Sequence, residues 1–296
     1  MKKKRENGFL KFKIYSLFVE LRLILKMIFW IASYPKSGNT WLRSLIANYL
    51  WPNDSNPFEN LKYIKSFPKR KNFEGIVDEG ILRDDCFKIF KHFITAQDKI
   101  NLNNELNIIK THNAAVSIQN HPFTNPTNSC GAVYIVRDPR SVAVSHAYHH
   151  GYDFEKSISH MLSDRTIAYN DKIYAEARLS WKVNYVSWKK HKMPKIIIKY
   201  EDLHNDTFNK FLEIIKFINQ FKKIEIDENK INQVIKKCSF SQLSENEKKV
   251  GFKEKKGEEN FFRKGLVDEW KTVLKKDLVE KIEKECSQEM KELKYI

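Results

Sequence analysis

Residues 27–50 constrain the fold more than any other stretch of the chain. An apolar run, MIFWIAS, leads directly into the polar loop YPKSGN, and TWLRSLIANYL follows with its apolar residues at helical spacing. These patterns predict a buried strand over 27–33, a tight loop, and a helix over 40–50. A strand, a tight loop and a helix in immediate succession are typical of a parallel α/β sheet.

Two further apolar runs that favour β-structure also lead into helical segments. AVYIV (132–136) precedes a helix predicted over 139–149, with Pro139 in its first turn and Asp138 as its N-cap. KIIIKY (195–200) precedes a helix predicted over 206–217. This alternation predicts an α/β fold, a parallel β-sheet flanked by helices on both faces. No linker or repeat divides the chain, which indicates a single domain.

The remaining segments give weaker patterns. Leu106 to Ile109 is a short apolar run that ends in KTH, and Cys86 to Phe90 is compatible with a short strand. We predict helices over 174–190 and from Val267 to the end, and a mobile charged loop over 241–265. The polar ends of the predicted strands should meet at one edge of the sheet, where α/β proteins bind their ligands.

Composition excludes some classes of protein and leaves others open. The chain has 296 residues, 42% of them hydrophobic and 13% aromatic, which excludes a disordered chain. Its formal net charge of +16 has two interpretations: a compositional bias toward Lys on solvated faces, or a surface for anionic partners. The four cysteines are far apart and form no CxxC pair, so we expect a reducing compartment and neither disulfides nor zinc.

The first 26 residues differ from the rest of the chain. They contain eight Lys or Arg and two Glu residues, interleaved with apolar residues. The charges at 20, 22 and 26 interrupt the apolar length of about 20 residues that a membrane span needs. Three interpretations remain: a basic amphipathic extension on a membrane surface, an extension that packs on the fold, or a true start at Met27.

Three polar motifs follow the predicted strands. YPKSGNTW offers backbone N–H groups, hydroxyls and the Lys36 ammonium to a phosphate, although it lacks the order of the usual nucleotide loop, GxxxxGK[ST]. KTH places a cation, Lys110, beside a potential base, His112. RDPRSVAVS places Arg137 about two helical turns before Ser145, so both could bind one phosphate. Taken alone, KTH could equally be a surface turn, and Arg137 could pair with Asp138.

His146, His149 and His150 cluster after the third motif. No carboxylate or Cys lies at ligand spacing, so we interpret them as residues of a groove or of the surface and expect no metal site. Basic runs are not interleaved with aromatic residues as in nucleic-acid-binding modules, so no nucleic-acid partner is expected.

Together the motifs resemble the sulfotransferases that use 3′-phosphoadenosine 5′-phosphosulfate (PAPS). YPKSGNTW resembles the family's 5′-phosphosulfate loop, and VRDPRSVAVSHAY resembles its 3′-phosphate segment, in the same order. KTH, KYEDL, CSFSQL and RKG match at corresponding places, so the resemblance covers about residues 28–271. The family's fold is a P-loop-like nucleotide-binding architecture, so we expect a sulfotransferase domain over 27–296 after the extension 1–26.

The resemblance implies a role for each matched residue. Catalytic roles fall to His112 as base, Lys36 as the residue that assists the leaving group, and Lys110 as the residue that stabilises the sulfuryl group. The residues that the resemblance places around PAPS are Lys36, Ser37, Gly38, Asn39, Thr40, Trp41, Arg137, Ser145, Tyr200, Ser239, Phe240, Arg263, Lys264 and Gly265. Three positions depart from the family pattern: Asn39 and Cys238 stand where Thr is usual, and Asp268 stands where a second Gly is frequent.

The resemblance implies a PAPS-dependent sulfotransferase that needs no metal. His112 would take the proton of an acceptor hydroxyl or amine, which attacks sulfur in line as 3′-phosphoadenosine 5′-phosphate (PAP) leaves. The acceptor would be a small molecule or a glycan, and the location cytoplasmic, with peripheral membrane contact through residues 1–26. Two alternatives are a kinase of related topology and a non-catalytic basic module that binds nucleic acid or membrane. The acceptor's identity and the oligomeric state stay open.

Overall fold

The computed structural model of the chain describes residues 27–296 except 54–55, 79–85, 104, 171 and 256–258. Its centre is a five-stranded sheet in the order β2-β3-β1-β6-β9, in which every neighbouring pair is parallel. The strands are β1 Ile28–Ala32, β2 Lys65–Ser66, β3 Asn107–Thr111, β6 Ser129–Val136 and β9 Lys195–Lys199. Two short antiparallel pairs lie outside it, β4 Ser117–Ile118 with β5 His121–Pro122, and β7 Ile167–Asn170 with β8 Ile173–Ala177.

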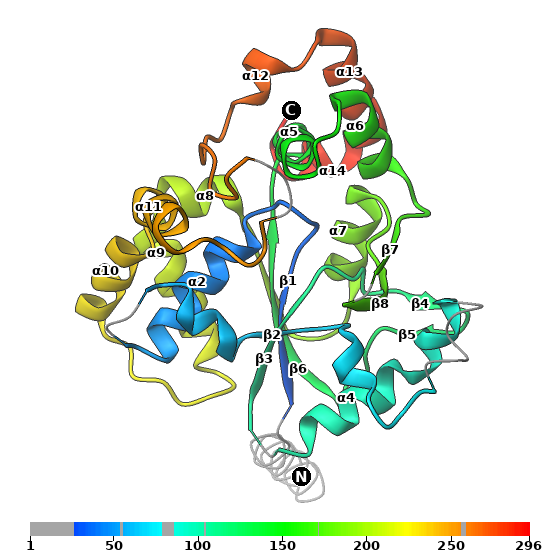
Figure 1. The fold of residues 1–296 in the computed structure, drawn as a ribbon, viewed down its shortest axis with the longest axis vertical. Helices are drawn as coiled ribbons and strands as arrows, with labels where there is room; N and C mark the ends of the chain where they lie inside the picture. Colours follow the sequence, from blue (N-terminus) through cyan, green and yellow to red (C-terminus); the bar gives the residue numbers. More distant parts are fainter. Residues whose placement is uncertain (1–26, 54–55, 79–85, 104, 171, 256–258) are drawn as a thin grey trace, which may run out of the picture.

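Helices cover both faces of this sheet (Figure 1). The α-helices are α2 Asn39–Leu50, α4 Phe93–Asn101, α5 Pro139–His150, α6 Phe154–Leu162, α7 Trp181–Lys190, α8 Tyr200–Asn205, α9 Thr207–Ile218, α10 Glu228–Lys237, α11 Phe240–Val250, α12 Trp270–Val273, α13 Lys276–Glu285 and α14 Ser287–Glu292. The 3₁₀-helices are η1 Glu59–Tyr63, η2 Arg70–Phe73 and η3 Cys86–His92. None of the helices within the described ranges combines the length and the apolarity that crossing a membrane requires.

The alternation of side chains along the buried strands produces two cores, one on each face. In β1, Trp30 belongs to one core together with residues of α4, α6, α7, α13 and α14, whereas Phe29 and Ile31 belong to the other together with residues of α2, α9 and α10. Both faces of a strand are apolar only when both are covered. The predicted α/β fold, a parallel sheet between two helical layers, is therefore confirmed.

The elements predicted from local patterns agree closely with the structure. The helix predicted over 40–50 is α2, and the helix predicted from Pro139 is α5, where the Asp138 side chain accepts a hydrogen bond from the backbone of Arg140 as an N-cap. Strands β1, β6 and β9 lie within or extend the three predicted apolar runs. The helix predicted over 206–217 is α9, capped by Asp206.

Four predictions were wrong wholly or in part. The strand predicted at Cys86–Phe90 is the 3₁₀-helix η3. The helix predicted over 174–190 begins only at α7, capped by Ser180, because the residues before it pair with β7 as strand β8. The loop predicted over 241–265 contains helix α11, which ends at Gly251. The C-terminal helix is broken into α12, α13 and α14, since Leu274 is extended and Cys286 leaves helical geometry.

Candidate active site

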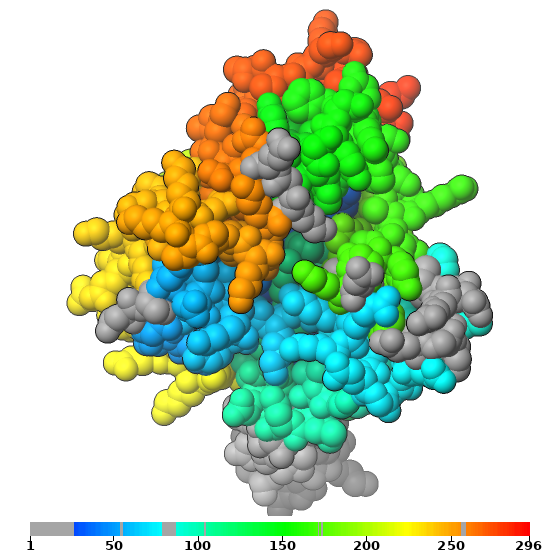
Figure 2. Space-filling view, in the orientation of Figure 1, coloured from blue at the N-terminus to red at the C-terminus, as the bar shows by residue number. Residues whose placement is uncertain are grey.

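The carboxyl ends of four parallel strands meet at one large cavity. Ser33, His112, Arg137 and Tyr200 follow directly after β1, β3, β6 and β9. The cavity measures about 1620 Å³, more than one drug-sized ligand needs, so a nucleotide and a second molecule could share it. Figure 2 shows the recess in the middle of this face, between the blue and cyan N-terminal segments, the green middle of the chain and the orange segment after α11.

The loop after β1 is shaped by a left-handed glycine. Gly38 has φ 94° and is the N-cap of α2, so the free N–H groups of the helix start face the loop. A Cβ atom on Gly38 would lie 2.5 Å from the Tyr200 ring, which leaves room for glycine alone. The positive end of α2 and this close-packed loop form the geometry that binds phosphates at helix starts.

Lys36 lies in the same loop beside other cations. Its Nζ is 4.0 Å from the centroid of the Phe261 ring, and its carbonyl accepts a hydrogen bond of 3.3 Å from Arg137. Burial, and then the Arg137 charge, lower the pKa of Lys36 to about 7, against the opposing effect of Glu254. The negative charge of an anionic ligand would offset both effects and stabilise the protonated form, so the site favours an anion next to this ammonium.

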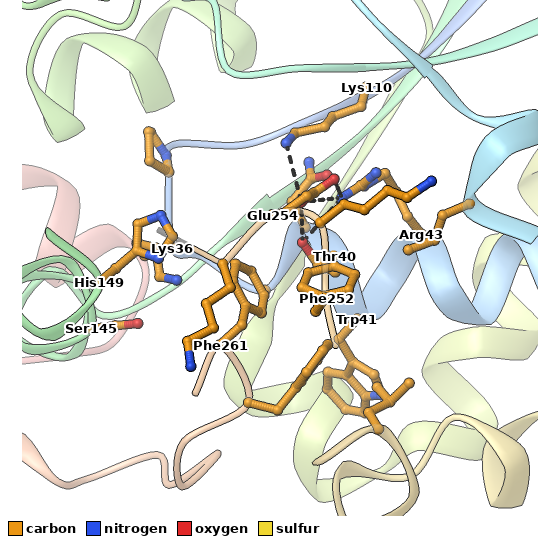
Figure 3. Close-up of a pocket in the computed structure, with 18 of the residues that line it drawn as sticks. Lys36, Thr40, Trp41, Arg43, Lys110, Ser145, His149, Phe252, Glu254 and Phe261 are labelled. Atoms are coloured by element: carbon orange, nitrogen blue, oxygen red, sulfur yellow. Dashed lines mark hydrogen bonds and ion pairs between the residues drawn. The ribbon is translucent and has the colours of Figure 1, made fainter. Parts of the chain in front are cut away.

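A carboxylate of the chain itself lies at the start of α2. Glu254 accepts a hydrogen bond of 3.1 Å from the Thr40 hydroxyl and two of 2.8 Å from Arg43, and it lies 3.8 Å from the Lys110 ammonium (Figure 3). Burial opposes ionisation of Glu254, but Arg43 and Lys110 outweigh it and hold its pKa well below the ordinary value. Burial lowers the pKa of Lys110 to about 8, against the opposing effect of Glu254.

His112 is held in the orientation that a general base needs. Its Nδ1 lies 2.9 Å from the Ser33 carbonyl oxygen and 3.1 Å from the Ser33 hydroxyl, and its backbone N–H donates to Glu176 at 3.3 Å. A proton on Nδ1 satisfies the carbonyl and leaves the Nε2 lone pair as the acceptor. Burial, and then the nearby Lys110 charge, lower the pKa of His112 to about 3, so the ring is neutral at physiological pH.

Arg137 lies at the other side of the loop with unused donors. Its Nη2 donates to the Leu266 carbonyl at 2.9 Å, its guanidinium lies 4.3 Å from the centroid of the Tyr200 ring, and its buried Nε has no partner. Asp138 pairs with Arg140 instead, at 2.6 Å, so within the described ranges Arg137 has no carboxylate partner. Ser145, two turns along α5, lines the same cavity. A bound anion would accept hydrogen bonds from the unused donors of Arg137 and balance its charge.

The segment before α12 closes the cavity with a second internal carboxylate. Arg263 forms an ion pair with Glu269, and the Lys264 ammonium lies 3.2 Å from the same side chain. Gly265 has φ 67°, and a Cβ there would lie 2.5 Å from the Phe240 ring, so glycine is needed at this close approach. Two carboxylates of the chain, Glu254 and Glu269, thus line the cavity, and basic residues hold each of them.

The structure gathers most of the sixteen predicted site residues around one cavity. Fourteen of them line it: Lys36, Gly38, Asn39, Thr40, Trp41, Lys110, His112, Arg137, Ser145, Tyr200, Phe240, Arg263, Lys264 and Gly265. Ser37 and Ser239 are not among the lining residues. The Ser37 hydroxyl is buried without a hydrogen-bond partner, and Ser239 caps α11 through a bond from Gln242.

Among the charged residues of the cavity that sequence reasoning missed, two form an ion pair at the start of α2. Arg43 lies one turn after Thr40 on α2, a spacing that places both on one face and could have revealed it. Glu254 lies in the charged segment after α11, and no local pattern distinguishes it from its neighbours. Of the three clustered histidines, His149 and His150 line the cavity as predicted, whereas His146 is buried against Ser157.

The two neutral buried histidines should make the fold less stable in mild acid. Burial, followed by the charges of neighbouring histidines and basic residues, also lowers the pKa of His146 to about 3. Between pH 6.5 and 3 the unfolded chain binds protons at His112 and His146 that the folded chain does not. The free energy of unfolding, measured with urea, should therefore fall by about 1–3 kcal/mol from pH 7.5 to 5.5. Equal free energies of unfolding at the two pH values would contradict the assignment of both histidines as neutral in the fold. So would a fall in His146→Gln as large as in the wild type.

Comparison with known proteins places this geometry in a family. A family model described as the sulfotransferase domain matches residues 27–294. The chain is 26% identical over 267 residues to flavonol 3-sulfotransferase of Flaveria bidentis, covering 86% of this chain and 79% of that protein. It is 24% identical to human sulfotransferase 1E1, covering 88% and 83%.

A solved structure supports the same fold. The mouse sulfotransferase SULT7A1, complexed with PAP, superimposes with a TM-score of 0.60 at 20% identity, covering 90% of this chain and 85% of that one. The family model spans nearly all of the described residues, including the motifs YPKSGNTW, KTH and RDPRSVAVS. The chain therefore belongs to the sulfotransferase-domain family.

Proposed function

We propose that the chain transfers a sulfuryl group from PAPS to a hydroxyl or amine of an acceptor. The observation that carries this proposal is that two anion-binding groups line one cavity together with a neutral histidine. One group comprises Lys36, Thr40 and Lys110, and the other comprises Arg137 and Ser145. PAPS has two anionic ends, a 5′-phosphosulfate and a 3′-phosphate, and the presence of PAP in the SULT7A1 structure supports the match.

The charge of the cavity supports a highly anionic co-substrate. Twelve Lys or Arg side chains line it against four Glu side chains, counted over the described residues. An observation at the cavity wall supports the fit: the buried Nε of Arg137 lacks a hydrogen-bond partner. Buried polar groups are normally hydrogen-bonded, so such atoms favour a ligand with oxygen acceptors.

The mechanism assigns each group a step. The acceptor O–H or N–H proton passes to Nε2 of His112 as the acceptor oxygen or nitrogen bonds to sulfur. The bond from sulfur to the bridging oxygen breaks, and its electron pair remains on the 5′-phosphate of PAP. Lys36 would stabilise the negative charge on that oxygen, and Lys110 the transferring sulfuryl oxygens. The sulfuryl group has less negative charge than a phosphoryl group, so two ammonium groups suffice without a metal.

Two rival functions explain the site less well. A kinase would use ATP, which has no 3′-phosphate to pair with Arg137. The loop YPKSGNTW also lacks the GK[ST] order of the usual ATP-binding loop. A basic module that binds nucleic acid or membrane does not explain a neutral histidine oriented by the Ser33 carbonyl. The kinase predicts binding of ATP, and the basic module predicts binding with a steep salt dependence. Neither predicts selectivity for PAP.

The remaining features of the proposal concern the acceptor and the location. The flavonol acceptor in the name of the Flaveria relative supports a small-molecule acceptor, with a glycan as the alternative. Two buried cysteines among the described residues, Cys238 and Cys286, are thiols outside any disulfide, which supports a cytoplasmic location. The extension 1–26, and its proposed peripheral membrane contact, lie outside the described residues.

Thermal shift and calorimetry with PAP, AMP and ATP test the function directly. We expect PAP at a hundred times its Kd to stabilise the fold by about 2.7 kcal/mol, with much weaker effects of AMP and ATP at the same concentration. The selectivity should persist at moderate salt. Binding of ATP as strong as that of PAP would favour the kinase, and binding of none of the three would favour the basic module.

A further inference from the structure

Arg43 is a buried cation that the assigned roles leave unexplained. Its side chain is 2% exposed, and it lies on α2 one turn after Thr40. Its Nη2 donates to the Thr40 hydroxyl at 3.1 Å, and its Nε has no hydrogen-bond partner. A buried guanidinium without an anion beside it destabilises the fold, so this position favours an anionic partner.

In this structure Glu254 supplies that anion. Its two carboxylate oxygens bind Arg43, one of them also accepts from Thr40, and the Lys110 ammonium approaches the same oxygen, as Figure 3 shows. Thr40 and Lys110 are two of the residues that the proposed function assigns to the phosphosulfate. The carboxylate oxygens of Glu254 therefore stand in for oxygens of a bound phosphosulfate group.

The contact is not needed to fasten the segment that carries Glu254. The carboxylate of Glu247, on α11, accepts hydrogen bonds of 2.6 and 2.8 Å from the backbone of Phe261 and Phe262. The rings of Phe252 and Phe262 also pack on Phe58, with centroids 4.7 and 5.6 Å away. These contacts hold Phe252 before Glu254 and Phe262 after it, so the Glu254 carboxylate can leave Arg43 while these residues stay in place.

We propose that Arg43 is a further residue that binds the phosphosulfate group of the co-substrate, and that Glu254 occupies its subsite until the co-substrate replaces it. This inference rests on the proposed function. The replacement exchanges one anion for another, so Arg43 is never left buried without a partner. Because Glu254 must be displaced, it weakens the binding of every ligand that has a 5′-phosphate, and it has no such effect on a ligand without one.

Calorimetry with two nucleotides tests the competition. PAP has a 5′-phosphate and adenosine 3′-phosphate lacks it. In Glu254→Gln we expect PAP to bind about tenfold more tightly, since a competing charge is removed, and adenosine 3′-phosphate to bind within about twofold of the wild type. The matched control is Glu259→Gln, an exposed carboxylate of the same segment outside the cavity, which should change neither affinity.

A second variant tests Arg43 without leaving a buried charge unpaired. Arg43→Met combined with Glu254→Gln removes both partners, and melting curves verify its fold. It should bind PAP at least about tenfold more weakly than Glu254→Gln alone. Unchanged or weaker PAP binding in Glu254→Gln, or equal PAP binding in the single and double variants, would overturn the inference. Failure of the wild-type chain to bind PAP would instead overturn the proposed function.

Discussion

Replacement of His112 by alanine should lower kcat by about 10²–10⁴-fold. The ring is neutral because burial and the Lys110 charge lower its pKa to about 3, so it can accept the acceptor's proton at any physiological pH. Its Nδ1 lies 2.9 Å from the Ser33 carbonyl, which fixes the tautomer with a free Nε2. Steady-state transfer of labelled sulfate from PAPS to an accepted phenol or alcohol gives the measurement.

A true base should affect turnover but not nucleotide binding. PAP should bind His112→Ala within about twofold of the wild type, because in the proposed mechanism the imidazole contacts the acceptor and not the nucleotide. The wild-type kcat/KM should also show no loss from His112 protonation between pH 7 and 5, since its pKa lies near 3. An unchanged kcat in His112→Ala would refute the role of base. A parallel loss of PAP binding would show that the residue only supports the fold.

The parts of the site that could be predicted are those contained in one short stretch of chain. Residues 27–50 fold into β1, the loop and α2 largely as their pattern indicates, because apolar spacing, Gly38 and the helix start act locally. The same holds for Arg137 at the end of β6 and for the helix that Pro139 begins. Parallel strands bring their carboxyl ends together, so these separate motifs had to converge on one cavity.

The elements that were missed depend on partners far along the chain. Strand β8 forms because it pairs with β7. Its sequence alone is compatible with the first turns of the helix predicted over 174–190. Helix α11 was interpreted as a loop because most of its side chains are polar or charged. Only Leu243 and Glu247 are buried, and such a polar helix has little apolar pattern to reveal it. Strand pairing outweighed local propensity in β8, whereas α11 lacked the apolar spacing by which a helix is recognised.

The internal carboxylates of the site were beyond prediction for the same reason. Arg43 and Glu254 are 211 positions apart, and nothing in the segment GFKEKKGEE indicates which acidic residue turns inward. Glu269 pairs with Arg263 and Lys264 beside Asp268, where the family often has a second glycine. The sequence identified that departure, but only the structure shows that a neighbouring carboxylate holds both basic residues.

Replacement of Arg137 by alanine should weaken PAP binding by about 10–150-fold, since hydrogen bonds to charged groups contribute about 1.5–3 kcal/mol. The guanidinium lies beside Tyr200, within the described residues it has no carboxylate partner, and its buried Nε is free to donate. Adenosine 5′-phosphosulfate lacks the 3′-phosphate, so its affinity should change by less than about threefold. Calorimetry with both ligands measures the difference.

The contrast between the two ligands separates recognition from structural support. Arg137 also donates to the Leu266 carbonyl, so its loss could loosen the segment that follows Gly265 and weaken both nucleotides together. Ser145→Ala provides a matched comparison, since it removes a hydroxyl assigned to the same phosphate without touching Leu266 or any charge. It should show the same selectivity with a smaller loss, because a neutral donor contributes less than a charged one. Equal losses for both ligands in Arg137→Ala would refute the 3′-phosphate role and leave Arg137 as a support for the closing segment.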